Sequence, residues 1–298
     1  MPEGHSIHRL ARQFTSVFAG EALRASSPQG RFAEGAERID GAVLTRARAH
    51  GKQLFLEFDN DLVMRVHLGL YGAWSFGGDS RFRGASSIGA PRRVGERETA
   101  DDDAPAVYAG PPLPVGAVRV RLVSAHGWAD LRGPTACEVI TGAERDAIIA
   151  RLGPDPLDPD TPPAEFIARV QRTRTAVGLS LMNQAVIAGV GNVYRAEVLF
   201  RRRVHPWLPG PALGDAGALA LWEDLVLLMN EGVRAGRIIT TTPNHRSSGA
   251  GNGSAVPAEE AHYVYKRTGQ ECRICGTSVA MAEMGARKLY WCPYCQAA

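Results

Sequence analysis

The amino-acid sequence predicts an α+β, multidomain protein: an N-terminal antiparallel β-sandwich with flanking helices, a helical domain with a helix–two turns–helix motif, and a C-terminal zinc-ribbon finger. Closely spaced, short strand patterns occupy the first part of the chain. Helical apolar periodicity dominates the second part, and four cysteines in two pairs lie near the C-terminus. A chain of 298 residues, 45% hydrophobic and 22% charged, can form two or three globular domains.

The first predicted element is an amphipathic helix over residues 6–19. Ile7, Leu10, Phe14 and Val17 follow the 3.6-residue spacing of one helix face. If this helix docks through that face, the residues just before it are held in place. Without such docking, the start of the chain would be an ordinary flexible terminus.

The terminus itself carries reactive groups. A small residue at position 2 normally allows Met1 to be removed, which leaves Pro2 with a free secondary amine. An α-amino group has a pKa of about 8, so a useful fraction is unprotonated near neutrality. Such an amine can attack a sugar or aldehyde carbon and form a Schiff base. Glu3, the next residue, can move protons.

Strand patterns follow at residues 42–49, 53–58, 62–68, 73–76 and 117–124. The sequences His50-Gly51-Lys52 and Asp59-Asn60-Asp61 predict turns between them. Short antiparallel strands of this spacing are typical of a sandwich or barrel, which we assign to residues 1–135. Residues 77–112 are rich in Gly, Ser, Pro, Arg and Asp and are expected to form a mobile insertion.

A helical domain is predicted over residues 136–258. Thr141 and Glu144 have capping-box spacing before a helix. Further helices are expected at 163–171, 178–188, 193–202 and 215–234, and residues 242–259 are expected to be mobile. Two glycines precede Asn192, so backbone N–H groups can approach a phosphate that Asn192, as N-cap, would also bind. The simpler alternative is a well-capped helix start.

The C-terminal finger is assigned to residues 259–298. Cys272-x2-Cys275 and Cys292-x2-Cys295 have zinc-ribbon spacing, and four thiolates close a tetrahedral coordination sphere. One structural Zn2+ is therefore expected, whereas two disulfides would be unusual in a reducing compartment. Cys137 stands apart and is interpreted as a small buried residue. Arg287 lies at the predicted hairpin tip, where a solvated cation is the simpler interpretation.

Composition and the N-terminal sequence indicate the cellular compartment in which the protein is expected to act. No apolar run reaches the roughly 20 residues of a membrane span. The N-terminus lacks the basic start and apolar core of a signal peptide, so we expect a cytoplasmic protein with no membrane partner. The net charge of +3 permits nucleic-acid binding without arguing for it.

Several motifs together resemble the formamidopyrimidine-DNA glycosylase/endonuclease VIII family of DNA repair enzymes, and they occur in that family's order along nearly the whole chain. They are Met1-Pro2-Glu3-Gly4, His50-Gly51-Lys52, His67-Leu68-Gly69-Leu70-Tyr71-Gly72, Leu152-Gly153-Pro154-Asp155, Gly189-Val190-Gly191-Asn192-Val193-Tyr194, Val264-Tyr265-Lys266-Arg267 and Cys292-Pro293-Tyr294-Cys295-Gln296.

The resemblance implies a bifunctional DNA glycosylase and apurinic/apyrimidinic lyase that acts on double-stranded DNA with damaged bases or abasic sites. It is expected to be a monomer in a prokaryotic cytosol, with the nucleoid DNA. Pro2 would attack C1′ of the damaged nucleotide, and Glu3 would be its acid/base partner. Lys52 would donate a proton or contact a phosphate during β-elimination.

Further residues take DNA-contacting roles in the resemblance. Arg287 would be the DNA-contacting arginine of the finger, and Asn192 would bind a phosphate. Arg132 is a looser match to an arginine that enters the strand opposite the lesion. Leu70 and Tyr71 would fill the gap left by a flipped base, although the bare pattern also fits sheet core.

Leu70-Tyr71 is similar to the endonuclease VIII branch, which prefers oxidised pyrimidines, and β,δ-elimination would then cleave the strand. The alternatives are excision of 8-oxoguanine and formamidopyrimidines by the same chemistry, or a non-catalytic zinc-dependent DNA-binding protein. Two departures from the family are the long insertion and Gly178, which replaces a lysine.

Overall fold

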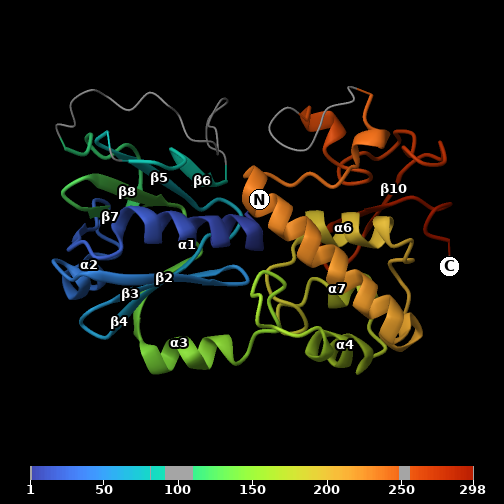
Figure 1. The fold of residues 1–298 in the computed structure, drawn as a ribbon, viewed down its shortest axis with the longest axis horizontal. Coiled ribbons are helices and arrows are strands. Elements are labelled where there is room, and N and C mark those ends of the chain that lie inside the picture. Colours follow the sequence, from blue (N-terminus) through green and yellow to red (C-terminus); the bar gives the residue numbers. More distant parts are fainter. Residues whose placement is uncertain (1, 81, 91–109, 248–255, 298) are drawn as a thin grey trace. The chain divides into compact units, whose positions relative to one another are not determined.

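The computed structural model describes residues 2–80, 82–90, 110–247 and 256–297, which form two compact units, Met1–Ala150 and Arg151–Ala298 (Figure 1). The first unit extends beyond the predicted domain end at residue 135. Residues 136–149 form a strand and a helix that pack on its second sheet, so the boundary lies after Ala150. Within the described ranges, no helix has the length and apolar character needed to cross a membrane.

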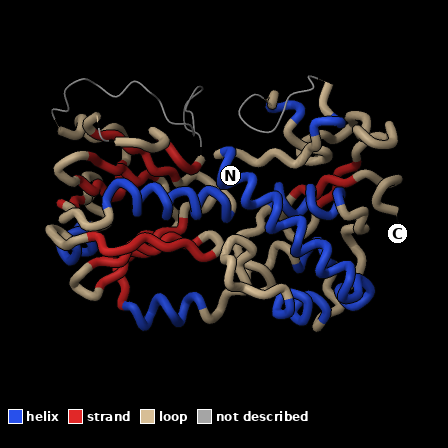
Figure 2. The backbone as a smooth tube through the Cα atoms, in the orientation of Figure 1, coloured by secondary structure: helices blue, strands red, loops and turns tan. Residues whose placement is uncertain are grey.

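The first unit is an antiparallel sandwich of two sheets, which confirms the predicted architecture (Figure 2). Residues from both sheets contribute to one buried core. One sheet has the order β1 (Arg24–Ser26), β7 (Val118–Val123), β8 (Gly127–Arg132), β5 (Ala73–Gly78), β6 (Ser87–Gly89), and the other β2 (Leu44–His50), β3 (Gln53–Phe58), β4 (Leu62–His67), β9 (Ala136–Thr141).

Three helices flank these sheets: α1 (Gly4–Phe18), α2 (Ala33–Ile39) and α3 (Gly142–Ile149). Figure 1 shows α1 alongside the sheets, where its apolar face is buried. Phe18 rather than Val17 completes that buried face. The Phe14 ring packs edge-on against Trp74 with centroids 4.8 Å apart, so the sandwich core fixes the helix. The predicted capping box at Thr141 and Glu144 is confirmed.

Part of the predicted mobile insertion at residues 77–112 is ordered. Residues 73–78 form β5, and Ser87–Gly89 form β6, which pairs with it. The side chain of Gln13 holds this stretch, because its amide exchanges two hydrogen bonds with the backbone of Ala85, at 2.8 and 2.9 Å. Residues 91–109 of the predicted insertion lie outside the described residues.

A buried ion pair joins two central strands of the first sheet. The Arg121 guanidinium donates to both oxygens of Asp130, at 2.7 and 2.8 Å. Asp130 is 1% exposed and Arg121 7%. Removing one partner of such a pair leaves an uncompensated buried charge, which is costly.

Asp130→Asn is therefore expected to lower the free energy of unfolding by about 3 kcal/mol or more, measured by urea denaturation. The matched control is Glu138→Gln, because the Glu138 partner Arg65 holds it in a partly exposed ion pair. That control is expected to cost less than about 1 kcal/mol. Equal, small losses in both variants would contradict the importance of the buried pair.

The second unit combines helices and a small hairpin. Its helices are α4 (Ala164–Gln171), α5 (Val177–Ser180), α6 (Asn192–Arg201) and α7 (Gly210–Ala235), with short 3-10 turns η1 (Pro243–His245) and η2 (Ala258–Glu260) and strands β10 (Ala280–Glu283) and β11 (Lys288–Trp291). The predicted helix 178–188 is wrong, because α5 ends at Ser180 and turn-type hydrogen bonds follow. Gly214 interrupts the helical geometry early in α7, close to the predicted helix start at 215.

The helical part and the finger belong to the same compact unit. Phe200 of α6 stacks on Tyr263 with centroids 5.0 Å apart, in a buried cluster that also contains Tyr290 and Cys292 of the finger. The predicted division at 258/259 thus crosses a shared core. Of the stretch 242–259 expected to be mobile, 242–247 and 256–259 are described and include η1, while 248–255 lie outside the described residues.

Candidate active site and metal centre

The chain start is held by the first unit. Pro2 and Glu3 are both buried, and Glu3 is 0% exposed. Glu3 takes the N-cap position of α1 in extended conformation, and its carbonyl accepts a hydrogen bond from the Ser6 N–H (3.0 Å). The helix that follows packs on β2 and β3. A nucleophile at this terminus would therefore have a fixed position rather than the freedom of a loose tail.

His5 is a buried residue of this site that the sequence did not single out. Burial, and next the charge of Arg9, lower its pKa to about 3. Its imidazole is therefore neutral at physiological pH. The Nε2 atom lies 3.2 Å from Ser6 Oγ. A neutral imidazole beside Glu3 and Pro2 adds no positive charge to the terminus.

Because His5 is buried as a neutral imidazole, the free energy of unfolding depends on pH below about 6.5. Its folded pKa of about 3 lies below the ordinary histidine value of 6.5, so its contribution is complete above pH 6.5 and is lost as pH falls toward 3. We expect His5→Gln to flatten the fall in unfolding free energy over that window, where one histidine contributes up to about 1.4 kcal/mol per pH unit. Urea denaturation at several pH values measures this. His8→Gln, on the same helix, is the control, and parallel curves for wild type and His5→Gln would refute the assignment.

Lys52 lies in the predicted hairpin turn between β2 and β3. His50 pairs with Gln53, so Gly51 and Lys52 form the tip. His67, at the end of the neighbouring β4, pairs with Gln53. Its pKa is lowered by burial and then by the charges of Lys52 and Arg65. The terminal helix packs on the same two strands that carry Lys52.

Leu70 and Tyr71 form an exposed apolar tip between β4 and β5. Their exposed fractions are 46% and 76%, so they are not sheet core. Gly69 has φ +65°, and a β-carbon there would lie 1.8 Å from Thr135 Oγ1. The Gly72 N–H bonds the Leu68 carbonyl at 2.9 Å. The two side chains are thus presented to solvent by a tight turn.

Arg132 is held within the first sheet. Its guanidinium donates to the Val115 carbonyl (2.8 Å), Ser75 Oγ (2.9 Å) and Asp130 Oδ2 (3.2 Å). Any movement of Arg132 into DNA would break all three bonds. The three hydrogen bonds of Arg132 within the sheet account for an arginine at this position without any contact with DNA.

Asn192 is the first residue of α6 rather than its cap, which is Gly191. Its Nδ2 donates to the Lys288 carbonyl at 2.9 Å, and its Oδ1 accepts from Arg195. The predicted N-cap role is therefore wrong. The structure instead brings Asn192 to the finger hairpin beside Arg287, two predicted site residues that lie far apart in sequence.

Arg195 is a second residue that the sequence did not single out. It is 0% exposed, and its guanidinium reaches the carbonyls of Met284 (3.3 Å), Gly178 (3.5 Å) and Lys288 (3.5 Å). A β-carbon on Gly178 would lie 2.8 Å from Met284 Sδ. A lysine at position 178 therefore does not fit this packing, which accounts for that departure from the family pattern. An arginine one turn into a helix gives no sequence signal of such a role.

The hairpin tip between β10 and β11 carries Arg287. The Met284 N–H donates to the Arg287 carbonyl at 2.9 Å; Met284 is buried, whereas Gly285 and Ala286 are exposed. Arg287 is exposed as well, as expected for a cation presented outward. The finger thus presents positive charge next to the start of α6.

The four predicted cysteines form a metal-binding cluster. Their Sγ atoms all lie within 4.8 Å of one another, with Cys272–Cys295 at 3.9 Å and Cys275–Cys292 at 3.5 Å. Tetrahedral Zn2+ with Zn–S bonds of about 2.3 Å needs sulfurs about 3.8 Å apart, so the donor set fits zinc. Cys137 lies apart in β9, where burial raises its pKa to about 12. It packs against the sandwich core but is only partly buried, rather than fully buried as predicted.

The chain matches three family models in order. Residues 1–109 match the formamidopyrimidine-DNA glycosylase N-terminal domain, residues 152–244 the formamidopyrimidine-DNA glycosylase H2TH domain, and residues 269–298 the zinc finger found in FPG and IleRS. The four cysteines lie inside the matched finger. The comparison therefore supports one structural zinc.

Relatives cover the chain almost completely. Endonuclease 8 1 of Mycobacterium tuberculosis is 43% identical over 299 residues, which are 99% of this chain and 100% of that protein. Probable endonuclease 8 2 of Streptomyces coelicolor is 29% identical over 100% of this chain and 94% of its own. The fold matches Lactococcus lactis Fpg in a complex with abasic-site DNA, with a TM-score of 0.73 at 18% identity, covering 99% of this chain and 100% of that one.

Proposed function

Because the chain belongs to the formamidopyrimidine-DNA glycosylase/endonuclease VIII family, and is therefore a base-excision repair DNA glycosylase and AP lyase, we propose that its nucleophile is the N-terminal amine of Pro2. The observation that carries this proposal is the burial of Pro2 and Glu3 at the start of a docked helix. Covalent catalysis needs a nucleophile in a fixed position, and a free chain end lacks one.

The proposed reaction begins when the damaged nucleotide leaves the base stack. The Pro2 nitrogen attacks C1′, the bond from C1′ to the base breaks, and the base departs with a proton. The C1′–O4′ bond then breaks as O4′ takes a proton, which opens the sugar ring, and the resulting iminium between Pro2 and C1′ acidifies the C2′ proton. Loss of that proton expels the 3′ phosphate, and a second elimination expels the 5′ phosphate. Glu3 moves the protons at O4′ and C2′, and Lys52 donates a proton or contacts a phosphate.

Candidate DNA contacts lie on each unit. We propose that Asn192 and Arg287 bind phosphates, which is supported by their proximity through the Lys288 carbonyl. Leu70 and Tyr71 would fill the gap in the stack, which is supported by their exposure at a turn. Arg132 remains a candidate for the opposite strand, although it would first have to leave its three hydrogen bonds.

Oxidised pyrimidines are the proposed substrates. Support comes from the Leu70-Tyr71 tip and from similarity to proteins named endonuclease 8. Relatives named formamidopyrimidine-DNA glycosylase, such as that of Salinispora arenicola at 32% identity, keep 8-oxoguanine as the second candidate. We further propose that the enzyme is a cytoplasmic monomer.

The substrate is tested with two matched duplexes, one carrying thymine glycol and one carrying 8-oxoguanine opposite C. We expect excision of thymine glycol at a rate at least about tenfold higher, which corresponds to about 1.4 kcal/mol of transition-state discrimination. An abasic duplex is the control for lyase activity. Efficient release of 8-oxoguanine with none of thymine glycol would overturn the substrate assignment while leaving the chemistry intact.

A further inference from the structure

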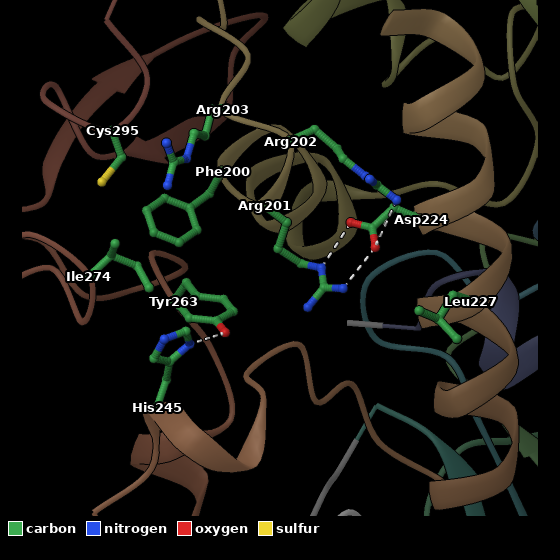
Figure 3. A pocket seen from close by; sticks show the side chains of 10 residues that line it. All are labelled: Phe200, Arg201, Arg202, Arg203, Asp224, Leu227, His245, Tyr263, Ile274 and Cys295. Carbon is green, nitrogen blue, oxygen red and sulfur yellow. Dashed lines mark hydrogen bonds and ion pairs between the residues drawn. The ribbon is translucent and has the colours of Figure 1, made fainter. Parts of the chain in front are cut away.

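A pocket of about 340 Å³ opens in the second unit, lined by residues of α6, α7 and the finger (Figure 3). Three consecutive arginines at the C-terminal end of α6 contribute to it. The ten residues of α6 span about 15 Å, so the pocket is well separated from Asn192 at the other end of that helix. Of its lining residues, only the zinc ligand Cys295 belongs to the sites described above.

The pocket carries a surplus of positive charge. Arg201 donates to both oxygens of Asp224 at 2.8 Å, and also to the Thr240 carbonyl. This pair neutralises the only carboxylate among the lining residues. Arg202 lies 3.7 Å from the same carboxylate and is 37% exposed. Arg203 is exposed, and the described part of the chain gives its guanidinium no ion pair.

Arg203 occupies a backbone position that normally favours glycine. Its φ is +54°, just after the end of α6, and the Val204 N–H bonds the Leu199 carbonyl at 2.9 Å. This is the Schellman arrangement, in which glycine at the left-handed position avoids strain from a β-carbon. An arginine therefore occupies this position against the backbone preference. Its side chain points to a role beyond ending the helix.

Apolar side chains line the same pocket. Leu227 of α7 is 50% exposed and Ile274 of the finger 43%, and Figure 3 shows them from different elements around the cavity. Phe200 and Tyr263 are 4% and 3% exposed and are stacked on each other. They offer no open ring face to a nucleobase. Phosphate recognition alone would need no exposed leucine and isoleucine.

We propose that this pocket binds an acidic peptide segment of a partner protein, with carboxylates at Arg202 and Arg203 and an apolar side chain between Leu227 and Ile274. Guanidinium groups match carboxylates in charge and geometry. Apolar walls beside Arg203 and the loosely paired Arg202 fit a segment that alternates acidic and apolar residues. The pocket is thus a docking site on the repair enzyme, separate from lesion chemistry.

The probe is a fluorescein-labelled peptide of alternating aspartate and leucine, titrated with the full-length zinc-loaded protein by fluorescence anisotropy. We expect saturable binding that Arg203→Gly, Arg202→Gln and Leu227→Ser each weaken at least about fivefold. Arg203→Gly should keep or raise the melting temperature, because it removes the strained β-carbon. If Arg203 had only a structural role, Arg203→Gly would not weaken peptide binding while it keeps or raises the melting temperature.

Two matched controls lie on α7 away from the pocket. Arg234→Gln removes an exposed arginine, and Leu219→Ser removes a partly exposed leucine, and both should bind the peptide as wild type does. A peptide with asparagine in place of aspartate should bind at least fivefold more weakly. Abasic-DNA affinity and strand cleavage should be unchanged in Arg203→Gly.

Three outcomes would overturn the proposal. The first is no peptide binding at about 1 mM. The second is equal weakening by the control variants. The third is a DNA contact, in which Arg203→Gly weakens duplex binding and duplex DNA displaces the peptide. None of these depends on whether Pro2 is the nucleophile, so the two proposals fail separately.

Discussion

An N-terminal extension that keeps Pro2 within a peptide bond is expected to abolish borohydride trapping of the enzyme on abasic DNA. An amide nitrogen is not nucleophilic, so no iminium forms for borohydride to reduce. The buried position of Pro2 leaves the amine in a fixed environment. Trapping is measured as a covalent protein–DNA band. Removing the extension from the denatured protein with a protease that leaves Pro2 first, followed by refolding with Zn2+, should restore the band.

Variants at the terminus sharpen the same test. Glu3→Gln should lower strand cleavage by about 100-fold or more, as expected for loss of a general acid/base. Pro2→Gly should lose the adduct, because the freer glycine terminus does not hold its amine in place. Both should bind abasic-analogue DNA as wild type does. Trapping by the extended protein, or none by the processed wild type, would refute the role of Pro2, and the latter would favour a non-catalytic DNA-binding protein.

Loss of zinc is expected to have the second large effect, on the folding of the finger and on DNA affinity. Cys292→Ser should release zinc and unfold the finger, because structural zinc supplies much of the folding energy of such modules. Cys292 is 0% exposed and shares a core with Phe200 and Tyr263, so damage will reach α6. The hairpin carbonyls bound by Asn192 and Arg195 would then be lost. DNA affinity should fall by at least about tenfold, or about 1.4 kcal/mol.

Zinc content, near-UV circular dichroism and DNA binding measured on the same samples check this expectation. Cys137→Ser is the matched control, because it removes a cysteine from the sandwich and should retain the metal. Undiminished DNA affinity in a zinc-free Cys292→Ser protein would contradict the proposed role of the finger in holding DNA.

Elements with local signals were predictable from the sequence. The stripe at Ile7, Leu10 and Phe14 predicted α1, and the cysteine spacing predicted the metal cluster. Strand β8 was not predicted, because Asp130 interrupts its apolar pattern and is stabilised mainly by Arg121 from a neighbouring strand. Periodicity alone cannot anticipate a buried charge whose partner lies elsewhere.

The site residues likewise divide into those predictable from local sequence and those that depend on a distant contact. The hairpin position of Lys52 followed from local turn chemistry. The partner of Asn192 did not, because the Lys288 carbonyl lies 96 residues away and a local cap was the simpler expectation. The start of α6 is therefore fixed by a long-range contact. Predicting it requires knowing where the finger hairpin packs.

The burial of Pro2 has a consequence for the order of events during biosynthesis. A peptidase that removes Met1 needs an accessible, extended chain end, and Pro2 in the folded first unit is buried. On the proposed mechanism, processing must therefore precede docking of Gly4–Phe18, while the nascent chain is still leaving the ribosome. A chain that folds first would be a stable protein able to bind DNA but permanently inactive as a lyase.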